Sequence, residues 1–383
     1  MVAMDLKSGE ILWTHRTRYA DPSERVKCAA TDAGWVGVCS SPVIIGDRLY
    51  YVAPHGVVYC LDTNGFHDDE DDGAKDTMDI DAGDVVFEFD LKSLGMRSYH
   101  YWGSSPATDG KLLYISTSPG SYTRQHSEVP GLIAIDVKTG KCVWQFRAAS
   151  KSGARCQLAS PSVASIGRRT QVIFAGGDGW VYSFDADSIA KGETKELWRF
   201  DACQGRGSTR LNIVASPVIH EGKVLIATAS RIPFLDNSPG VLWCIDGSRR
   251  GHLSNVPDAK GDNSGVLWKV SLENEIIANP VVHDGLAYVV DTEGQMACIR
   301  VDNGSEHWRR RLEQDVWATP LWLADQLLVT GSDGIVFGLK ANGIARPVCK
   351  MNREVYATPT ANGDSLVIAS QDTIRCFNCS DPN

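Results

Sequence analysis

The most informative segment of this chain is Ala134-Ile-Asp136-Val-Lys-Thr-Gly140-Lys-Cys-Val-Trp144. Looser copies of it run from Ala3 to Trp13 and from Cys298 to Trp308. Comparable segments end at Leu197-Trp198 and Leu267-Trp268. A motif that returns several times along 383 residues indicates an internal repeat, of the kind found in propellers and solenoids.

A small residue followed by proline marks the start of each repeat. At this position of the repeat the pair occurs seven times, as Ser41-Pro42, Ser105-Pro106, Ser160-Pro161, Ser216-Pro217, Asn279-Pro280, Thr319-Pro320 and Thr358-Pro359. After each pair come apolar residues, a turn such as Asp284-Gly285, a β-rich run and a second turn such as Gly177-Asp178-Gly179. A third strand and a fourth strand that ends on tryptophan then follow. Runs bounded by such turns indicate antiparallel hairpins, and four short strands per repeat predict the blades of an all-β propeller.

These segments resemble the tryptophan-docking motif of the pyrroloquinoline-quinone-like (PQQ-like) β-propeller family, Ala-x-Asp-x-x-x-Gly-Lys-x-x-Trp. Ala134–Trp144 fits it at every fixed position, and the resemblance covers essentially the whole chain. It is greatest to exported bacterial propeller-repeat proteins and to the scaffold of the outer-membrane barrel assembly machinery. The resemblance implies that the Asp–Gly stretch forms the turn between the third and fourth strands. It also implies that docking tryptophans pack between blades, which gives a structural role to Trp13, Trp144, Trp198, Trp268 and Trp308.

The strand count predicts a single propeller domain over residues 1–383, with seven to eight blade positions. Residues 1–16 supply a partial blade, 17–356 six complete blades and 357–379 a last, partial blade. Closure with seven blades would pair Ile11–His15 with the C-terminal hairpins and leave the strand around Val2–Leu6 redundant. We favour eight, the number common in the family, because Met1 falls inside a strand motif. The start of the first blade would then lie upstream.

Charge and composition argue against several classes of function. The formal net charge is −9, whereas nucleic-acid binding needs a concentrated basic face, so we expect no nucleic-acid partner. No run approaches the roughly 20 apolar residues that span a bilayer, so we expect no membrane insertion. The first residues carry no export signal. The resemblance nevertheless favours a periplasmic or cell-envelope protein with an incomplete N-terminus, a cytoplasmic location being the alternative, and we expect a monomer.

The eleven cysteines are not distributed like a disulfide framework. Cys60, Cys244, Cys298 and Cys376 share one repeat position, which predicts buried thiols that pack as small apolar groups. No two cysteines are adjacent in this sequence. In the PQQ-like family that the sequence resembles, the alcohol-oxidising members use a disulfide between adjacent cysteines. We therefore predict a non-enzymatic scaffold with no catalytic residue and no cofactor. A pyrroloquinoline-quinone-dependent alcohol or sugar dehydrogenase is the alternative hypothesis.

An acidic insertion at residues 67–79 lies between the predicted third and fourth strands of the first complete blade. Asp68, Glu70, Asp72 and Asp79 fall at positions 1, 3, 5 and 12 of a calcium-loop template, with Gly73 at position 6. Position 12 is Asp rather than the usual Glu, and no flanking helices are predicted. The insertion is therefore consistent with a calcium site and also with a solvated acidic loop.

The loops that lead into each proline form the candidate binding site. In a propeller the first strand of every blade runs along the central channel, so these loops surround one mouth of the funnel. Aromatic and arginine side chains are enriched in binding surfaces. We predict that the funnel binds a protein or saccharide through His100, Trp102, Arg155, Arg210, Asn212, Asp315, Trp317, Arg353 and Tyr356.

Overall fold

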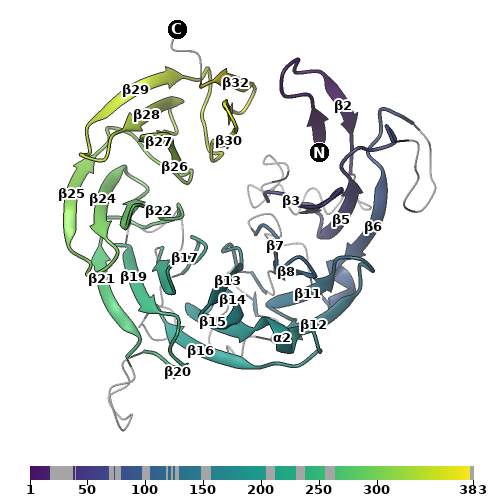
Figure 1. Cartoon of the computed structure of the whole chain (residues 1–383), viewed down its shortest axis with the longest axis horizontal. Helices are drawn as coiled ribbons and strands as arrows, with labels where there is room; N and C mark the ends of the chain where they lie inside the picture. Colours follow the sequence, from purple (N-terminus) through teal and green to yellow (C-terminus); the bar gives the residue numbers. More distant parts are fainter. Residues whose placement is uncertain are drawn as a thin grey trace. The chain divides into compact units, whose positions relative to one another are not determined.

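The computed structural model is an all-β chain that separates into two compact units, which we call unit 1 (Met1–Arg199) and unit 2 (Phe200–Asn383). Both units are built from small antiparallel sheets (Figure 1). The structure describes residues 1–17, 38, 40–68, 73, 79–96, 104–117, 120–121, 124–125, 129–147, 157–203, 212–229, 238–254 and 264–379.

Among its described residues, unit 1 contributes four strands to each of three sheets, preceded by the hairpin of β1 (Val2–Met4) and β2 (Ile11–Thr14). The first sheet contains β3 (Val43–Ile45), β4 (Arg48–Val52), β5 (Val57–Asp62) and β6 (Val85–Asp90), followed by the 3-10 helix η2 (Leu91–Leu94). The second contains β7 (Ala107–Thr108), β8 (Leu112–Ser116), β11 (Leu132–Asp136) and β12 (Cys142–Phe146). Between β8 and β11 in the chain, β9 (Gly120–Ser121) and β10 (Arg124–Gln125) form a separate two-stranded sheet. The third contains β13 (Ser162–Ile166), β14 (Arg169–Ala175), β15 (Trp180–Asp185) and β16 (Glu196–Asp201), with helix α2 (Ala186–Ile189) between the last two.

Unit 2 continues the pattern with three four-stranded sheets and one sheet in which the structure describes three strands. The first contains β17 (Val218–His220), β18 (Lys223–Ala227), β19 (Val241–Asp246) and β21 (Val266–Ser271), with the short β20 (Gly251–His252) between the last two in the chain. The second contains β22 (Val281–His283), β23 (Leu286–Val290), β24 (Gln295–Arg300) and β25 (Glu306–Arg311). The third contains β26 (Leu321–Leu323), β27 (Gln326–Thr330), β28 (Ile335–Leu339) and β29 (Ala345–Lys350), and the last contains β30 (Thr360–Asn362), β31 (Ser365–Ala369) and β32 (Ile374–Asn378).

The predicted blades are confirmed: each four-stranded sheet is an antiparallel meander that begins directly after a proline. The hairpin between β22 and β23 shows why the turn residues recur. Asp284 and Gly285 have φ angles of 47° and 70°, and two consecutive positive φ angles are the type I′ geometry that suits a two-residue hairpin. The pairs Glu221-Gly222 and Asp284-Gly285 therefore set the register between the first two strands of their blades.

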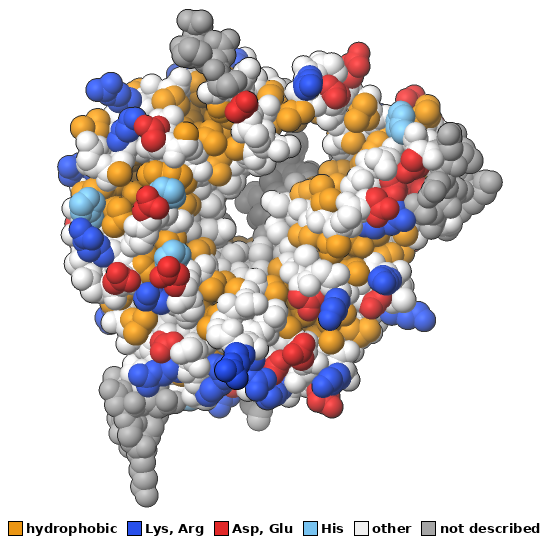
Figure 2. All heavy atoms as spheres, in the orientation of Figure 1, with side chains coloured by type: hydrophobic (Ala, Val, Ile, Leu, Met, Phe, Trp, Pro, Cys, Tyr) orange, Lys and Arg blue, Asp and Glu red, His pale blue; other side chains and the backbone are white. Residues whose placement is uncertain are grey.

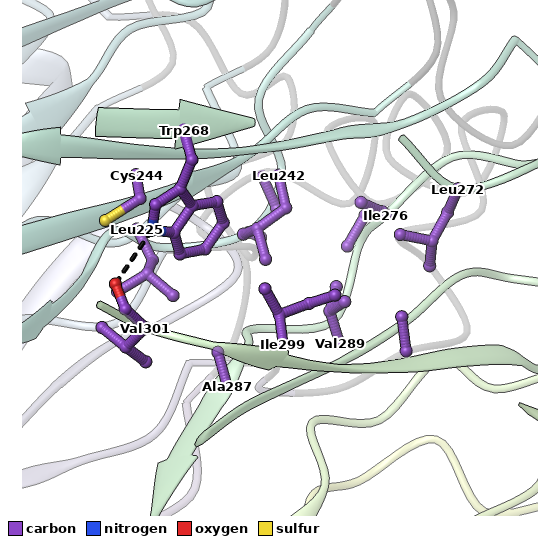
Figure 3. Close-up of a cluster of buried hydrophobic side chains, with 13 residues drawn as sticks. Leu225, Leu242, Cys244, Trp268, Leu272, Ile276, Ala287, Val289, Ile299 and Val301 are labelled. Carbon is purple, nitrogen blue, oxygen red and sulfur yellow. Dashed lines mark hydrogen bonds between the residues drawn. The ribbon is translucent and has the colours of Figure 1, made fainter. Parts of the chain in front are cut away.

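Within each unit, docking tryptophans fix some of the sheets to the next one along the chain. In unit 2, Trp268 of β21 lies over Ala287 and Ile299 of the following sheet, and its indole Nε1 donates to the carbonyl of Val301 at 2.8 Å (Figure 3). Trp308 of β25 donates in the same way to the carbonyl of Ala341 at 2.7 Å. An indole thus contributes both apolar area and one satisfied donor between two sheets.

A glycine in the following sheet makes room for several of the docking rings. An added Cβ on Gly304 would lie 2.5 Å from the indole Cγ of Trp268, a distance that requires something to shift. The same holds for Gly343 against Trp308, for Gly65 against Trp13 and for Gly140 against Phe87, which occupies the tryptophan position of the first complete blade. The glycine of the docking motif therefore receives the ring of the preceding blade rather than that of its own.

Within each unit, the small residues before the prolines link neighbouring sheets by hydrogen bonds. The backbone N–H of one such residue donates to the side-chain oxygen of the equivalent residue one blade later, at 2.7–3.2 Å. In unit 1 this series of hydrogen bonds joins Ser41, Ser105 and Ser160. In unit 2 it joins Ser216, Asn279, Thr319 and Thr358. The position is occupied by Ser, Thr or Asn because only a short side chain with an acceptor satisfies the neighbouring amide.

Thr319→Val is expected to lower the free energy of unfolding by about 1–3 kcal/mol, because it leaves the partly buried N–H of Asn279 without its acceptor at nearly constant volume. Thr319→Ser keeps the hydroxyl and is the matched control. The measurement is the urea midpoint of each variant. No loss of stability for Thr319→Val, or a larger loss for Thr319→Ser, would contradict a role of the hydrogen bond.

Two details of the sequence prediction are wrong. The tryptophan does not end the fourth strand, because β12, β16, β21 and β25 each continue for two or three residues beyond it. Cys376 is exposed, whereas Cys60, Cys244 and Cys298 at the same repeat position are buried as predicted. The reason is that β32 is the outermost of three described strands, so its side chains alternate between exposed and half-buried.

Candidate binding site at the pre-proline loops

The pre-proline loops of unit 2 are the segments that precede Pro217, Pro280, Pro320 and Pro359, and hydrogen bonds hold their backbones in place. The carbonyl of the fifth residue before each proline accepts from the backbone N–H of a residue just beyond the second strand of the same blade. The donor–acceptor pairs are Ala229 and Asn212, Thr292 and Glu275, Ser332 and Asp315, and Gln371 and Glu354, at 2.8–3.2 Å. The loops therefore present their side chains from a fixed frame.

A pocket of about 480 Å³ lies at the loop before Pro320, and one blade supplies most of its wall. The loop contributes Glu313, Gln314, Asp315 and Trp317, the turn between β23 and β24 contributes Glu293, and β25 ends in the pocket at Arg311. Glu275 joins them from the loop before Pro280. We call this the acidic pocket.

Carboxylates dominate the charge of the acidic pocket. Four carboxylates, those of Glu275, Glu293, Glu313 and Asp315, face one guanidinium, that of Arg311, which leaves a formal excess of three negative charges. Arg311 is paired with Glu293 at 2.8 Å and with Glu273 outside the pocket at 3.3 Å. Within the part of the chain that the structure describes, Glu313 and Asp315 form no ion pair, and both are exposed.

A buried carboxylate, Asp291, positions two walls of the pocket. Its Oδ2 accepts from the backbone N–H of Asn274 at 3.0 Å, and its Oδ1 accepts from the backbone N–H groups of Glu293 and Gln295 at 3.1 and 2.8 Å. Burial raises the pKa of Asp291 against the opposing effect of these hydrogen bonds. The loop before Pro280 and the turn after β23 are thereby tied to one side chain.

Two exposed aromatic rings stand at the rim of the acidic pocket. Trp317 lines the pocket and is 38% exposed, and Tyr356 at the equivalent position of the next loop is 49% exposed. Their ring centroids are 5.8 Å apart in an edge-to-face arrangement. Large apolar groups of this size are seldom left exposed side by side without a partner to cover them.

The structure brings together part of the predicted funnel set. Asp315 and Trp317 line the acidic pocket, and the ring of Tyr356 contacts that of Trp317. Arg353 lies beside Asp372, with 3.8 Å between Nε and Oδ2. Asn212 is buried, and its Nδ2 has no hydrogen-bond partner among the described residues. Four predicted funnel residues lie outside the described residues: His100, Trp102, Arg155 and Arg210.

The acidic insertion lies between β5 and β6, as predicted. Asp68 and Asp79 are both exposed, and each accepts a local hydrogen bond, from Asn64 Nδ2 and from the backbone N–H of Asp81 respectively. Glu70 and Asp72 lie outside the described residues. Calcium binding by this loop stays a prediction, which a calorimetric titration with Ca²⁺ would test.

The surface in Figure 2 carries acidic and basic side chains interspersed, with apolar patches between them. Of the helices in the described residues, none combines the length and the apolar character needed to cross a bilayer.

A profile of the family described as outer membrane protein assembly factor BamB matches residues 1–255 and 249–346. This chain belongs to that family. Among solved structures, BamB from Moraxella catarrhalis matches 90% of this chain and 85% of its own length, with a TM-score of 0.61 and 14% sequence identity. That likeness shows that the BamB-family chain has the β-propeller fold. The computationally designed protein Ika8 matches 90% of this chain and 98% of its own length, with a TM-score of 0.43 and 11% identity, and a search of curated proteins found no match.

Sequence reasoning placed Glu275 in a pre-proline loop but left it out of the predicted binding set, and it missed Glu293, Arg311, Glu313 and Gln314 as members of the site of this BamB-family chain. One signal was available, because aligning the repeats on their prolines places Glu275, Asp315 and Glu354 at the same position, five residues before the proline. The contributions of Glu293 and Arg311 had no such signal, since they come from other elements of the blade.

Proposed function

We propose that this protein is a non-enzymatic scaffold of the bacterial cell envelope that binds a protein partner through the pre-proline loops of unit 2. The observation that carries the proposal is the exposed pair Trp317 and Tyr356 beside the acidic pocket. Aromatic residues next to charged groups on a concave surface are typical of the residues that contribute most to protein–protein affinity.

Rigidity of the loops supports this function. The backbone of each pre-proline loop is bonded to the blade that follows it, and Val316 N–H also donates to the carbonyl of Thr292 in the preceding blade at 3.1 Å. A surface that is ordered before its partner arrives loses less conformational entropy on binding. The site therefore suits recognition of a folded or extended protein segment, and it requires no cofactor and no catalytic residue.

Family membership supports the envelope location and the class of partner. The family description names an outer membrane assembly factor, and we transfer to this chain the expectation of a protein partner in the same compartment. A saccharide could also stack on Trp317, but the charge of the acidic pocket favours a ligand with positive charge.

The test is affinity capture from a bacterial envelope extract, followed by titration of the captured protein against purified variants. Trp317→Ala combined with Tyr356→Ala is expected to weaken binding at least about tenfold, because such anchors typically contribute 2 kcal/mol or more. Ile344→Ala combined with Val348→Ala removes comparably exposed apolar groups elsewhere in unit 2 and serves as the control. Equal affinity of both double variants would contradict the proposed site, and capture of a saccharide alone would contradict the proposed partner.

A further inference from the structure

We propose that the acidic pocket is a receptor for a single arginine side chain presented by the partner. This inference rests on the proposed function and names the chemistry that its site recognises. Three independent features of the pocket lead to it: the charge of its wall, an amide group without partners, and the aromatic rim.

The negative charge of the pocket wall indicates a positively charged ligand. Glu313 and Asp315 are exposed on the loop before Pro320, whereas Arg311, the cation of the pocket, already pairs with Glu293 and Glu273. A cation that enters the pocket meets an excess of negative charge rather than a competing guanidinium. A pocket of about 480 Å³ falls in the range of ordinary ligand sites, so a side chain can enter with its stem.

An amide without partners distinguishes the ligand further. Gln314 lines the pocket, and both its Oε1 and its Nε2 are buried without a hydrogen-bond partner among the described residues. Its amide occupies space that opens because Gly331 has no side chain, since an added Cβ there would lie 1.7 Å from Oε1. Buried polar groups are rarely left unsatisfied, so an unpaired amide in a pocket wall points to a ligand that supplies the missing hydrogen bond.

A guanidinium meets these requirements better than an ammonium. It presents five N–H donors in a planar fork, which can bond a carboxylate through two parallel hydrogen bonds and still reach an amide oxygen. It also stacks on aromatic rings, and Trp317 and Tyr356 provide two at the rim. The carboxylates Glu313 and Asp315, the amide of Gln314 and the ring of Trp317 together match an arginine side chain.

The test follows the resonance of Trp317 by ¹⁹F nuclear magnetic resonance in the full chain labelled with 5-fluorotryptophan. Trp317→Phe assigns the resonance by its loss. The probe is N-acetyl-arginine amide, and N-acetyl-citrulline amide is the neutral isostere. We expect a saturable shift with the arginine probe and binding at least about tenfold weaker with citrulline, because a charge-assisted pair is lost. A shift of equal affinity with citrulline, or no saturable shift with arginine, would overturn the inference.

Matched variants distinguish the effect of the pocket carboxylates from the effect of the protein's overall negative charge. Glu313→Gln with Asp315→Asn should weaken the arginine probe about tenfold or more, whereas Glu10→Gln with Glu193→Gln removes two exposed carboxylates in unit 1 and should leave it unchanged. Equal behaviour of the two pairs would contradict an arginine receptor. If the probe binds as expected but the partner titration is unaffected by Trp317→Ala with Tyr356→Ala, the proposed function fails while the receptor stands. If the partner titration responds but the probe does not bind, only the receptor fails.

Discussion

Trp268→Ala is expected to lower the free energy of unfolding by about 3–5 kcal/mol, the usual cost of removing a large aromatic side chain from a core. The indole is 8% exposed and packs with Leu225 and Leu242 of its own sheet and with Ile299 of the next. Its truncation also leaves the carbonyl of Val301 without its donor. Both losses weaken the contact between the two sheets.

The measurement for Trp268→Ala is urea unfolding followed by circular dichroism, with Trp317→Ala as the control. Trp317 is a tryptophan of the same unit with 38% exposure, so its truncation should change the free energy of unfolding by less than about 1 kcal/mol. A similar loss for both variants would contradict the docking role assigned to Trp268.

Gly304→Ala is expected to destabilise the protein by several kcal/mol more than Gly9→Ala. The two glycines have nearly the same φ angles, 73° and 74°, so both substitutions carry the same penalty of about 1–2 kcal/mol for a left-handed alanine. They differ in surroundings, because a Cβ on Gly304 overlaps the indole of Trp268 and a Cβ on Gly9 has nothing within 4 Å. The difference between the variants therefore isolates the packing of the docking ring.

Thermal unfolding of the two glycine variants provides the measurement. A melting temperature that falls clearly further for Gly304→Ala than for Gly9→Ala is the expected result. Equal shifts in melting temperature would mean that the ring of Trp268 moves aside at little cost. They would contradict the claim that the sheets need a glycine at position 304 to pack together.

Most of the fold was predictable because its determinants are local and recur. Proline fixes the start of each blade, and consecutive residues with positive φ such as Asp284 and Gly285 fix its hairpins, so each signal is visible in a few adjacent residues. The exposure of Cys376 was not predictable from its repeat position, since burial depends on which strands lie beside β32. The partner of each docking glycine was missed for the same reason, because Gly304 contacts a ring 36 residues earlier in the chain, at position 268.

The site was predictable only in part. Trp317 and Tyr356 could be named because aromatic residues in exposed loops before a strand are unusual enough to notice. Arg311 and Glu293 join them only through the pairing of β24 with β25 and the fold of the turn after β23. No spacing in the sequence predicts that Arg311 and Glu293 lie beside these aromatic residues.

Site-specific photo-crosslinking tests the central claim, that a protein partner binds at the pre-proline loops of unit 2. A photoreactive phenylalanine replaces Tyr356 in one variant and Ile344 in another, two exposed positions of unit 2 with exposed fractions of 49% and 54%. In living bacterial cells we predict one defined protein adduct from position 356, which is lost when Glu313→Gln and Asp315→Asn are added, and no adduct from position 344. An adduct from position 344 alone, or no protein adduct from either position, would contradict the central claim.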